Sequence, residues 1–175
     1  MQNARVPKGI VLRPDAAGRQ AIRTLWGLLK DAGLPSIASH RKGDYEPHLS
    51  LTVADDLEHA VTAMDPAKVL PSATVAFEVL GSFPSGVLLL AAVPDQRLLT
   101  AQLHAYEACA GAEVWRFYEP GRWNPHITLG YGYTPTQIGR AAELVLPLLP
   151  LTLTGWTAWL EDGSTGESWP LTGIT

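Results

Sequence analysis

Cysteine, excess positive charge and long apolar runs are all scarce in this sequence, and each scarcity excludes a class of protein. The single cysteine, Cys109, excludes an internal disulfide and with it the disulfide-stabilised folds of small secreted proteins. Its place among alanines on a helical pattern indicates a buried structural thiol rather than a nucleophile. A net charge of −4 argues against a broad nucleic-acid-binding face. No apolar run reaches the ~20 residues that span a bilayer.

The bulk composition is that of an ordinary folded domain. A hydrophobic content of 46% supports a buried core, so we expect one domain over residues 1–175. The N-terminal segment is too polar, and is interrupted too soon by Pro14 and Asp15, for a signal peptide. Together with the single cysteine, this predicts a cytoplasmic protein, and we expect it to be a monomer without membrane contact.

Two closely similar copies of one five-residue motif do occur in the sequence, PHLSL at 47–51 and PHITL at 125–129. With average residue usage such a pentamer occurs at about one position in 10⁵, so two copies indicate a duplication. Alternate side chains of a strand share a face. His48 therefore shares a face with Ser50, and His126 with Thr128, while the intervening aliphatic residues pack on the other side.

The two histidines are 78 residues apart, and the same offset aligns the rest of the chain. The apolar run 8–13 falls on 86–91, and 73–79 falls on 151–157. Each half-repeat, roughly 8–83 and 86–171, then has the order strand, helix, histidine strand, helix, strand. We predict an α+β fold of two pseudo-symmetric lobes with mostly antiparallel sheets flanked by helices. A two-fold axis between the lobes would bring the histidines face to face.

Caps, apolar stripes and turn residues predict the individual elements. In the first half we expect a helix from about Asp15 that ends at Gly33, and a second helix over 59–64. A hairpin of strands 73–83 and 87–93 follows, and then a helix over 95–110 whose inward face consists of Leu98, Leu99, Leu103 and Tyr106. The chain continues with a helix from Thr134 and with strands over 151–160 and near 167–171.

A facing pair of histidines predicts acid–base chemistry, since each can accept or donate a proton near neutral pH. The hydroxyls of Ser50 and Thr128 suit a group whose two non-bridging oxygens gain charge, as in a phosphodiester. A metal site would need a second ligand on the same strands, and neither strand carries one. We therefore expect no metal and no cofactor. Because water without a metal is a weak attacker, a cyclic phosphate, or a diester beside a 2′-hydroxyl, is the better-matched substrate.

These paired His-x-Ser/Thr strands in a duplicated α+β chain resemble the 2H phosphoesterase superfamily, in particular its 2′-5′ RNA ligase and RNA 2′,3′-cyclic phosphodiesterase branch. The resemblance covers nearly the whole chain, and its most specific piece is WNPHITL at 123–129. It implies a central cleft between two lobes and catalytic roles for His48, Ser50, His126 and Thr128. The implied reaction is metal-independent hydrolysis of an RNA or nucleotide 2′,3′-cyclic phosphate to a 2′-phosphate, in some members with reversible 2′-5′ joining of RNA ends.

Further candidates for contact with the substrate lie near the two motifs. Arg41, Lys42 and Arg122 can supply positive charge for a phosphate, and Tyr118 and Trp123 can stack on a base.

One position departs from the family pattern. Many members of the RNA-processing branch carry an arginine shortly after the second motif, where this chain has Gly130 and Tyr131. Continued strand alternation predicts that Tyr131 faces the core.

Two alternative functions stay open. The first is a non-catalytic protein that binds a nucleotide or an RNA end, and the second is a phosphodiesterase for another small cyclic phosphate metabolite.

Overall fold

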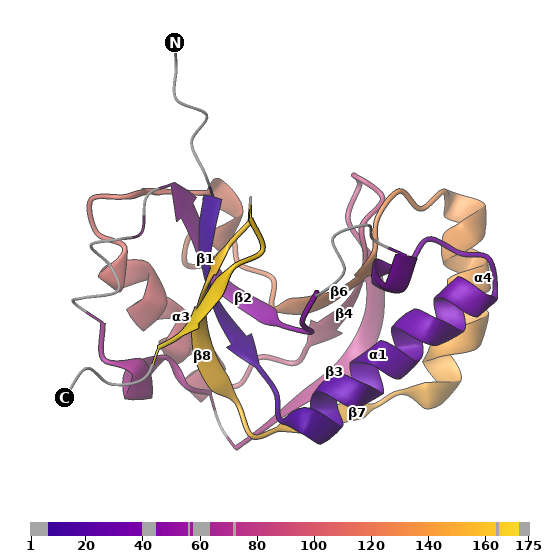
Figure 1. Ribbon diagram of the computed structural model, residues 1–175, viewed down its shortest axis with the longest axis horizontal. Coiled ribbons are helices and arrows are strands. Elements are labelled where there is room, and N and C mark those ends of the chain that lie inside the picture. Colours follow the sequence, from indigo (N-terminus) through magenta and orange to yellow (C-terminus); the bar gives the residue numbers. More distant parts are fainter. Residues whose placement is uncertain are drawn as a thin grey trace, which may run out of the picture.

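Two antiparallel sheets form two lobes that meet along the middle of the molecule (Figure 1). The computed structural model describes residues 7–39, 45–55, 57, 64–71, 73–163 and 165–171. The first sheet has the strand order β5-β2-β1-β8-β9 and the second has the order β6-β4-β3-β7. The strands are β1 (Pro7–Arg13), β2 (Leu49–Asp55), β3 (Thr74–Ser82), β4 (Leu88–Ala92), β5 (Glu113–Val114), β6 (His126–Gly130), β7 (Leu151–Thr154), β8 (Thr157–Asp162) and β9 (Ser168–Pro170).

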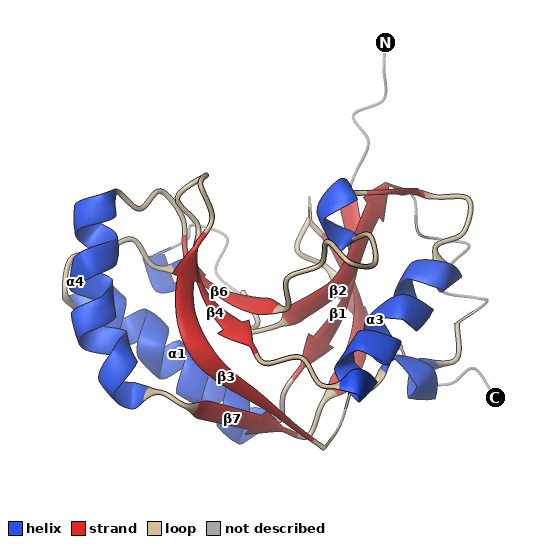
Figure 2. Ribbon diagram, turned by 180° about the vertical axis from the view of Figure 1, so that it is seen from behind, coloured by secondary structure: helices blue, strands red, loops and turns tan. Residues whose placement is uncertain are grey.

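Helices cover the outer face of each sheet, so the class is α+β as predicted (Figure 2). α1 (Ala16–Asp31) and α4 (Pro135–Val145) pack together on the second sheet, and α3 (Gln96–Ala108) packs on β2 of the first. Short 3₁₀ turns lie at Ile37–Ser39, Pro66–Val69, Arg116–Tyr118 and Leu146–Leu148. The predicted helix over 59–64 falls almost entirely outside the described residues.

The predicted caps are present where the helices begin. Asp15 accepts a hydrogen bond from the Gly18 N–H at 2.8 Å, and Asp95 accepts one from the Leu98 N–H at 2.7 Å. Thr134 forms a capping box at the start of α4. These caps confirm the three helix starts that the sequence predicted.

The inward face of α3 differs from the prediction. Leu98 is buried as expected, but Leu99 and Leu103 are exposed. The buried face instead consists of residues at helical spacing from Leu98, namely Ala101, Gln102 and Ala105. Small alanines let the helix lie close to the sheet, whereas the two leucines point away from it, so leucine content misidentified the packed face.

Each sheet takes strands from both halves of the sequence. β8 and β9, from the second half, complete the sheet of β1 and β2, while β3, from the first half, pairs with β4. The run 151–160, predicted as one strand, is therefore two. It breaks at Gly155, whose φ of +64° lets the chain leave the second sheet and enter the first.

The pairing register repeats with the offset of 78 residues. In the first sheet Val11 lies opposite Ser50 and Trp159, and in the second Leu89 lies opposite Thr128 and Gly81. β1 thus corresponds to β4, β2 to β6, and β8 to β3, which gives the two lobes the pseudo-symmetry that the sequence predicted.

Cys109 has the structural role that its surroundings predicted. It is buried at the end of α3, and its thiol donates a hydrogen bond to the Ala105 carbonyl at 3.1 Å. Burial raises the pKa of the thiol to about 11, which keeps it protonated and unreactive near neutral pH. Among the residues that the structure describes, no helix has the length and apolar character needed to cross a membrane.

Candidate active site

The two motif strands meet where the two sheets approach each other. β2 and β6 contact one another across the middle of the molecule (Figures 1 and 2). β6 is the edge strand of its sheet, and β2 is paired with β5 only at Ala54 and Asp55. Both motifs therefore lie on strand edges that open toward the other lobe.

The two histidines are held in the same way. His48 Nδ1 lies 2.9 Å from the Glu46 carbonyl, and His126 Nδ1 lies 2.7 Å from the Asn124 carbonyl. A carbonyl can only accept, so Nδ1 carries the hydrogen in each ring and Nε2 is left for chemistry. Arg19 and Arg23 of α1 pair with Glu46, which fixes the segment before His48.

The ring of His126 is biased toward its neutral form. Burial is the main cause that lowers its pKa below the usual value, and the hydrogen bond to Asn124 opposes that shift. The charge on His48 lowers the pKa of His126 further. The two rings are thus near enough for the charge of one to influence the protonation of the other.

An indole N–H donates a hydrogen bond to the backbone carbonyl of each hydroxyl residue of the motifs. Trp123 Nε1 donates to the Ser50 carbonyl at 2.9 Å, and Trp26 Nε1 donates to the Thr128 carbonyl at 3.0 Å. These donors satisfy backbone acceptors on the open strand edges. The side chain of Ser50 is also hydrogen-bonded to Tyr118, whose pKa is raised above its usual value chiefly by burial.

A small cavity joins the two motifs. Its lining includes His48 from one motif, Thr128 from the other, and the aromatic residues Tyr45 and Tyr131. The Tyr45 ring stacks on His48, with centroids 6.2 Å apart and planes 25° from parallel. Burial, followed by the neighbouring Tyr131, raises the pKa of Tyr45, so its hydroxyl stays protonated.

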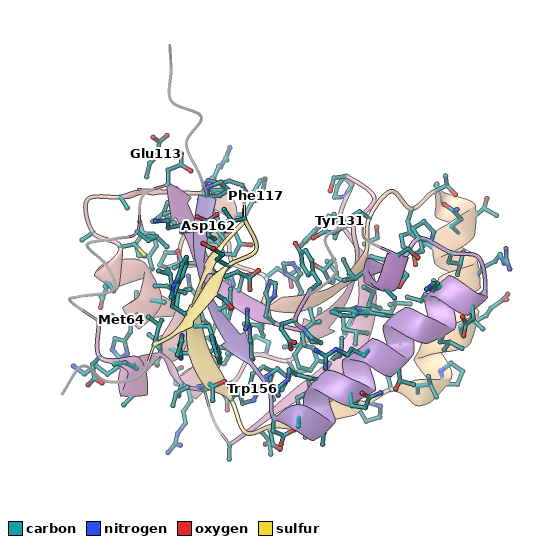
Figure 3. All side chains as sticks on the ribbon, in the orientation of Figure 1. Met64, Glu113, Phe117, Tyr131, Trp156 and Asp162 are labelled. Atoms are coloured by element: carbon teal, nitrogen blue, oxygen red, sulfur yellow. The ribbon has the colours of Figure 1, made fainter. Side chains whose placement is uncertain are left out.

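The prediction that Tyr131 packs in the core is wrong. β6 ends at Gly130, so strand alternation no longer applies to the next residue, and Tyr131 is 43% exposed at the cavity. A side chain at Gly130 could not be accommodated, because a Cβ there would lie 2.6 Å from the Pro35 carbonyl oxygen. Figure 3 shows Tyr131 and the exposed Phe117 on opposite lobes.

A carboxylate behind His48 was missed by sequence reasoning. Glu161 Oε2 lies 3.6 Å from His48 Nδ1 and 2.9 Å from Arg13 Nη2. The Arg13 guanidinium also lies 4.6 Å from the centre of the Trp159 ring. No local pattern marks Glu161, because it reaches the first motif only through the exchange of β8 between the two halves.

The other predicted substrate-contacting residues are placed differently from one another. Arg122 is exposed and pairs with Glu119 at 3.1 Å, so part of its charge is already compensated. Trp123 packs against the core and uses its N–H to hold Ser50, and Tyr118 contacts Ser50 directly. Arg41 and Lys42 lie outside the described residues.

Within the described part of the chain, no three His, Cys, Asp or Glu residues form a group suited to a metal ion.

Comparison with solved structures shows the same architecture in proteins of low sequence identity. E. coli LigT in complex with NADP+ matches with a TM-score of 0.58 and 19% identity, over 97% of this chain and 96% of that one. A crystal structure named as a phosphoesterase matches with 0.57 and 18%, over 97% and 99%. E. coli LigT with 3′-AMP matches with 0.54 and 17%, over 95% and 99%. No family model and no curated protein sequence matches the chain. The predicted resemblance is thereby confirmed for the two-lobed α+β fold.

Proposed function

We propose that this protein is a metal-independent phosphoesterase that hydrolyses the 2′,3′-cyclic phosphate of an RNA end or a nucleotide to a 2′-phosphate. The observation that carries this proposal is the symmetric pair of histidines, each anchored through Nδ1 to a backbone carbonyl and each followed by a hydroxyl residue. The fold supports it, since the similar structures include a named phosphoesterase and LigT bound to nucleotides.

In this reaction the two imidazoles act on opposite sides of the phosphorus. One Nε2 takes a proton from the attacking water, and the other gives a proton to the leaving 3′-oxygen. Ser50 and Thr128 donate hydrogen bonds to the non-bridging oxygens as these gain charge. With an RNA 5′-hydroxyl in place of water, the same groups would join two ends through a 2′-5′ bond as the bond to the 3′-oxygen breaks, and the reverse of that step would cleave the 2′-5′ bond.

We also propose that residues 1–175 act as one domain with half-repeats 8–83 and 86–171. The exchange of β3 and β8 supports this, because each half supplies a strand that the sheet of the other half needs. A site built from one histidine of each half then requires the whole chain.

The decisive experiment is turnover of 2′,3′-cyclic nucleotides and of RNA with 2′,3′-cyclic ends, with products assigned by phosphorus NMR. We expect a 2′-phosphate as the product, at a rate that EDTA does not change, and turnover lowered by about 10²–10⁴ in His48→Ala and in His126→Ala. A 3′-phosphate product, or loss of activity with EDTA that one added divalent ion restores, would contradict the proposal. Tight nucleotide binding without turnover would favour a binding protein instead.

A further inference from the structure

The two halves of the site differ at the residues behind the histidines. Glu161 pairs with Gly9 on β1, and at the same register in the second sheet the Phe83 N–H donates to the Val87 carbonyl at 3.0 Å. With the offset of 78 residues, Phe83 is therefore the counterpart of Glu161. In the same way, Ala91 is the counterpart of Arg13.

The first lobe thus has a charged pair where the second lobe has apolar side chains. Behind His48, the Glu161 carboxylate is fixed by Arg13, which is itself buried and stacked on Trp159. The ion pair with the guanidinium holds that carboxylate in one orientation. Nδ1–H of His48 donates to the Glu46 carbonyl, so a positive charge on the ring lies beside a negative group that is already in place.

Behind His126 the surroundings favour the uncharged ring. The rings of Phe83 and His126 pack edge to face, with their centroids 5.0 Å apart and their planes at 90°. Burial lowers the pKa of His126, and a proton on His48 adds to that effect. Among the described residues, the titratable groups around His48 are Glu161 from β8, Glu46 and Tyr45 before β2, and Tyr131 after β6, while Arg13 from β1 pairs with Glu161.

We propose that His48 is the general acid and His126 the general base of hydrolysis, with Glu161 as the positioning residue that sets this division. The proposal rests on the proposed function and assigns the acid and the base within its symmetric pair of histidines. His126 Nε2 takes one proton from water while the water oxygen bonds to phosphorus. The bond from phosphorus to the 3′-oxygen breaks, and His48 Nε2–H protonates that oxygen. The rings finish with their protons exchanged, and solvent returns them to the starting state.

The first test measures ring protonation without any turnover. Long-range ¹H–¹⁵N NMR spectra across pH report the protonation of each imidazole. We expect His48 in the wild type to hold its second proton at a pH where His126 has lost it. In Glu161→Gln, which keeps the shape and removes the charge, the difference between the pH values at which the two rings titrate should narrow or reverse. Glu167→Gln removes an exposed carboxylate from the nearby β8–β9 turn and should leave that difference unchanged. An unchanged difference in Glu161→Gln would overturn the positioning role.

The second test assigns the two roles by the leaving group. A 2′,3′-cyclic phosphate with sulfur at the leaving 3′-position expels a thiolate, which needs no proton. Glu161→Gln should lower turnover of the oxygen substrate about tenfold. His48→Ala should lower it by about 10²–10⁴. With sulfur, both variants should return to within about tenfold of wild type, while His126→Ala should stay as impaired as before.

The outcomes separate the two proposals. Recovery of His126→Ala but not of His48→Ala with the sulfur substrate would reverse the assignment of acid and base and leave the proposed function intact. Absence of turnover by the wild-type protein on both substrates would instead refute the proposed function, and with it the catalytic part of this inference.

Discussion

Replacement of Trp26 by phenylalanine tests whether the site depends on the hydrogen bond that its indole N–H donates to the edge strand β6. Trp26 lies on α1 and is only 5% exposed, and its Nε1 donates to the Thr128 carbonyl across 102 positions of sequence. Phenylalanine keeps most of the apolar contact but removes the only N–H of the side chain. The open edge of β6 would then carry an unsatisfied carbonyl next to the Thr128 hydroxyl.

The size of the effect follows from the two losses. A buried acceptor without its partner costs about 1–3 kcal/mol. The smaller ring leaves a void that adds roughly 1 kcal/mol. Together these predict that the free energy of unfolding falls by about 2–4 kcal/mol. For a chain of this length each kcal/mol moves Tm by about 2–4 °C, so Tm should fall by roughly 5–15 °C.

Thermal unfolding followed by circular dichroism measures this directly. Trp169→Phe is the matched control, because Trp169 is 45% exposed on the edge strand β9 and the same atoms are removed. The control should change Tm by about 2 °C or less. Turnover of a cyclic phosphate at a temperature where both variants are folded should fall in Trp26→Phe alone. Equal losses of Tm in the two variants, or no loss in either, would refute the role of this hydrogen bond.

The remaining predictions concern the polar groups of the site and the buried thiol. Ser50→Ala and Thr128→Ala should each lower turnover by about 10²–10³, less than either histidine variant does, and a wild-type rate in the double variant would exclude both hydroxyls. His48→Ala combined with His126→Ala should be little slower than the slower single variant, and the wild-type rate should follow a bell-shaped pH profile that each single variant loses. The lowered pKa of His126 means that the unfolded state binds more protons, so the stability that its neutral ring contributes is complete above about pH 6.5 and is lost as the pH falls. Urea titrations from about pH 7 to about pH 5 should therefore show a steeper loss of stability for wild type than for His126→Asn. Cys109 should react with iodoacetamide at pH 8 only after unfolding, since burial and a pKa of about 11 both protect it.

Local patterns predicted those parts of the fold that depend on local interactions. Asp15 and Asp95 predicted helix starts because a cap bonds to an N–H three residues away. The His-x-Ser and His-x-Thr spacing predicted shared faces because a strand alternates from one residue to the next. The common offset of 78 residues extended these local inferences to a two-fold relation between the lobes, which the strand registers reproduce.

What the sequence did not predict depends on where the strands go. Gly155 permits a break in the run 151–160, but no local pattern indicates that β7 and β8 belong to different sheets, so the charged partner of His48 on β8 could not be identified. Tyr131 was misplaced because alternation was carried one residue beyond the end of β6. Leu99 and Leu103 were misplaced because apolar residues lie on more than one face of α3, and the neighbouring sheet selects which face is buried.

The exchange of β3 and β8 has a consequence for the origin of such a chain. A polypeptide of half this length would hold one motif histidine, and its sheet would lack the strand that the other half now supplies. Two such polypeptides could complete each other only by trading that strand, as in a domain-swapped dimer. In that ancestor the two motif histidines would have been identical residues in identical surroundings. Fusion of the two copies into one gene is what allows a carboxylate to be placed beside one histidine and an aromatic ring beside the other.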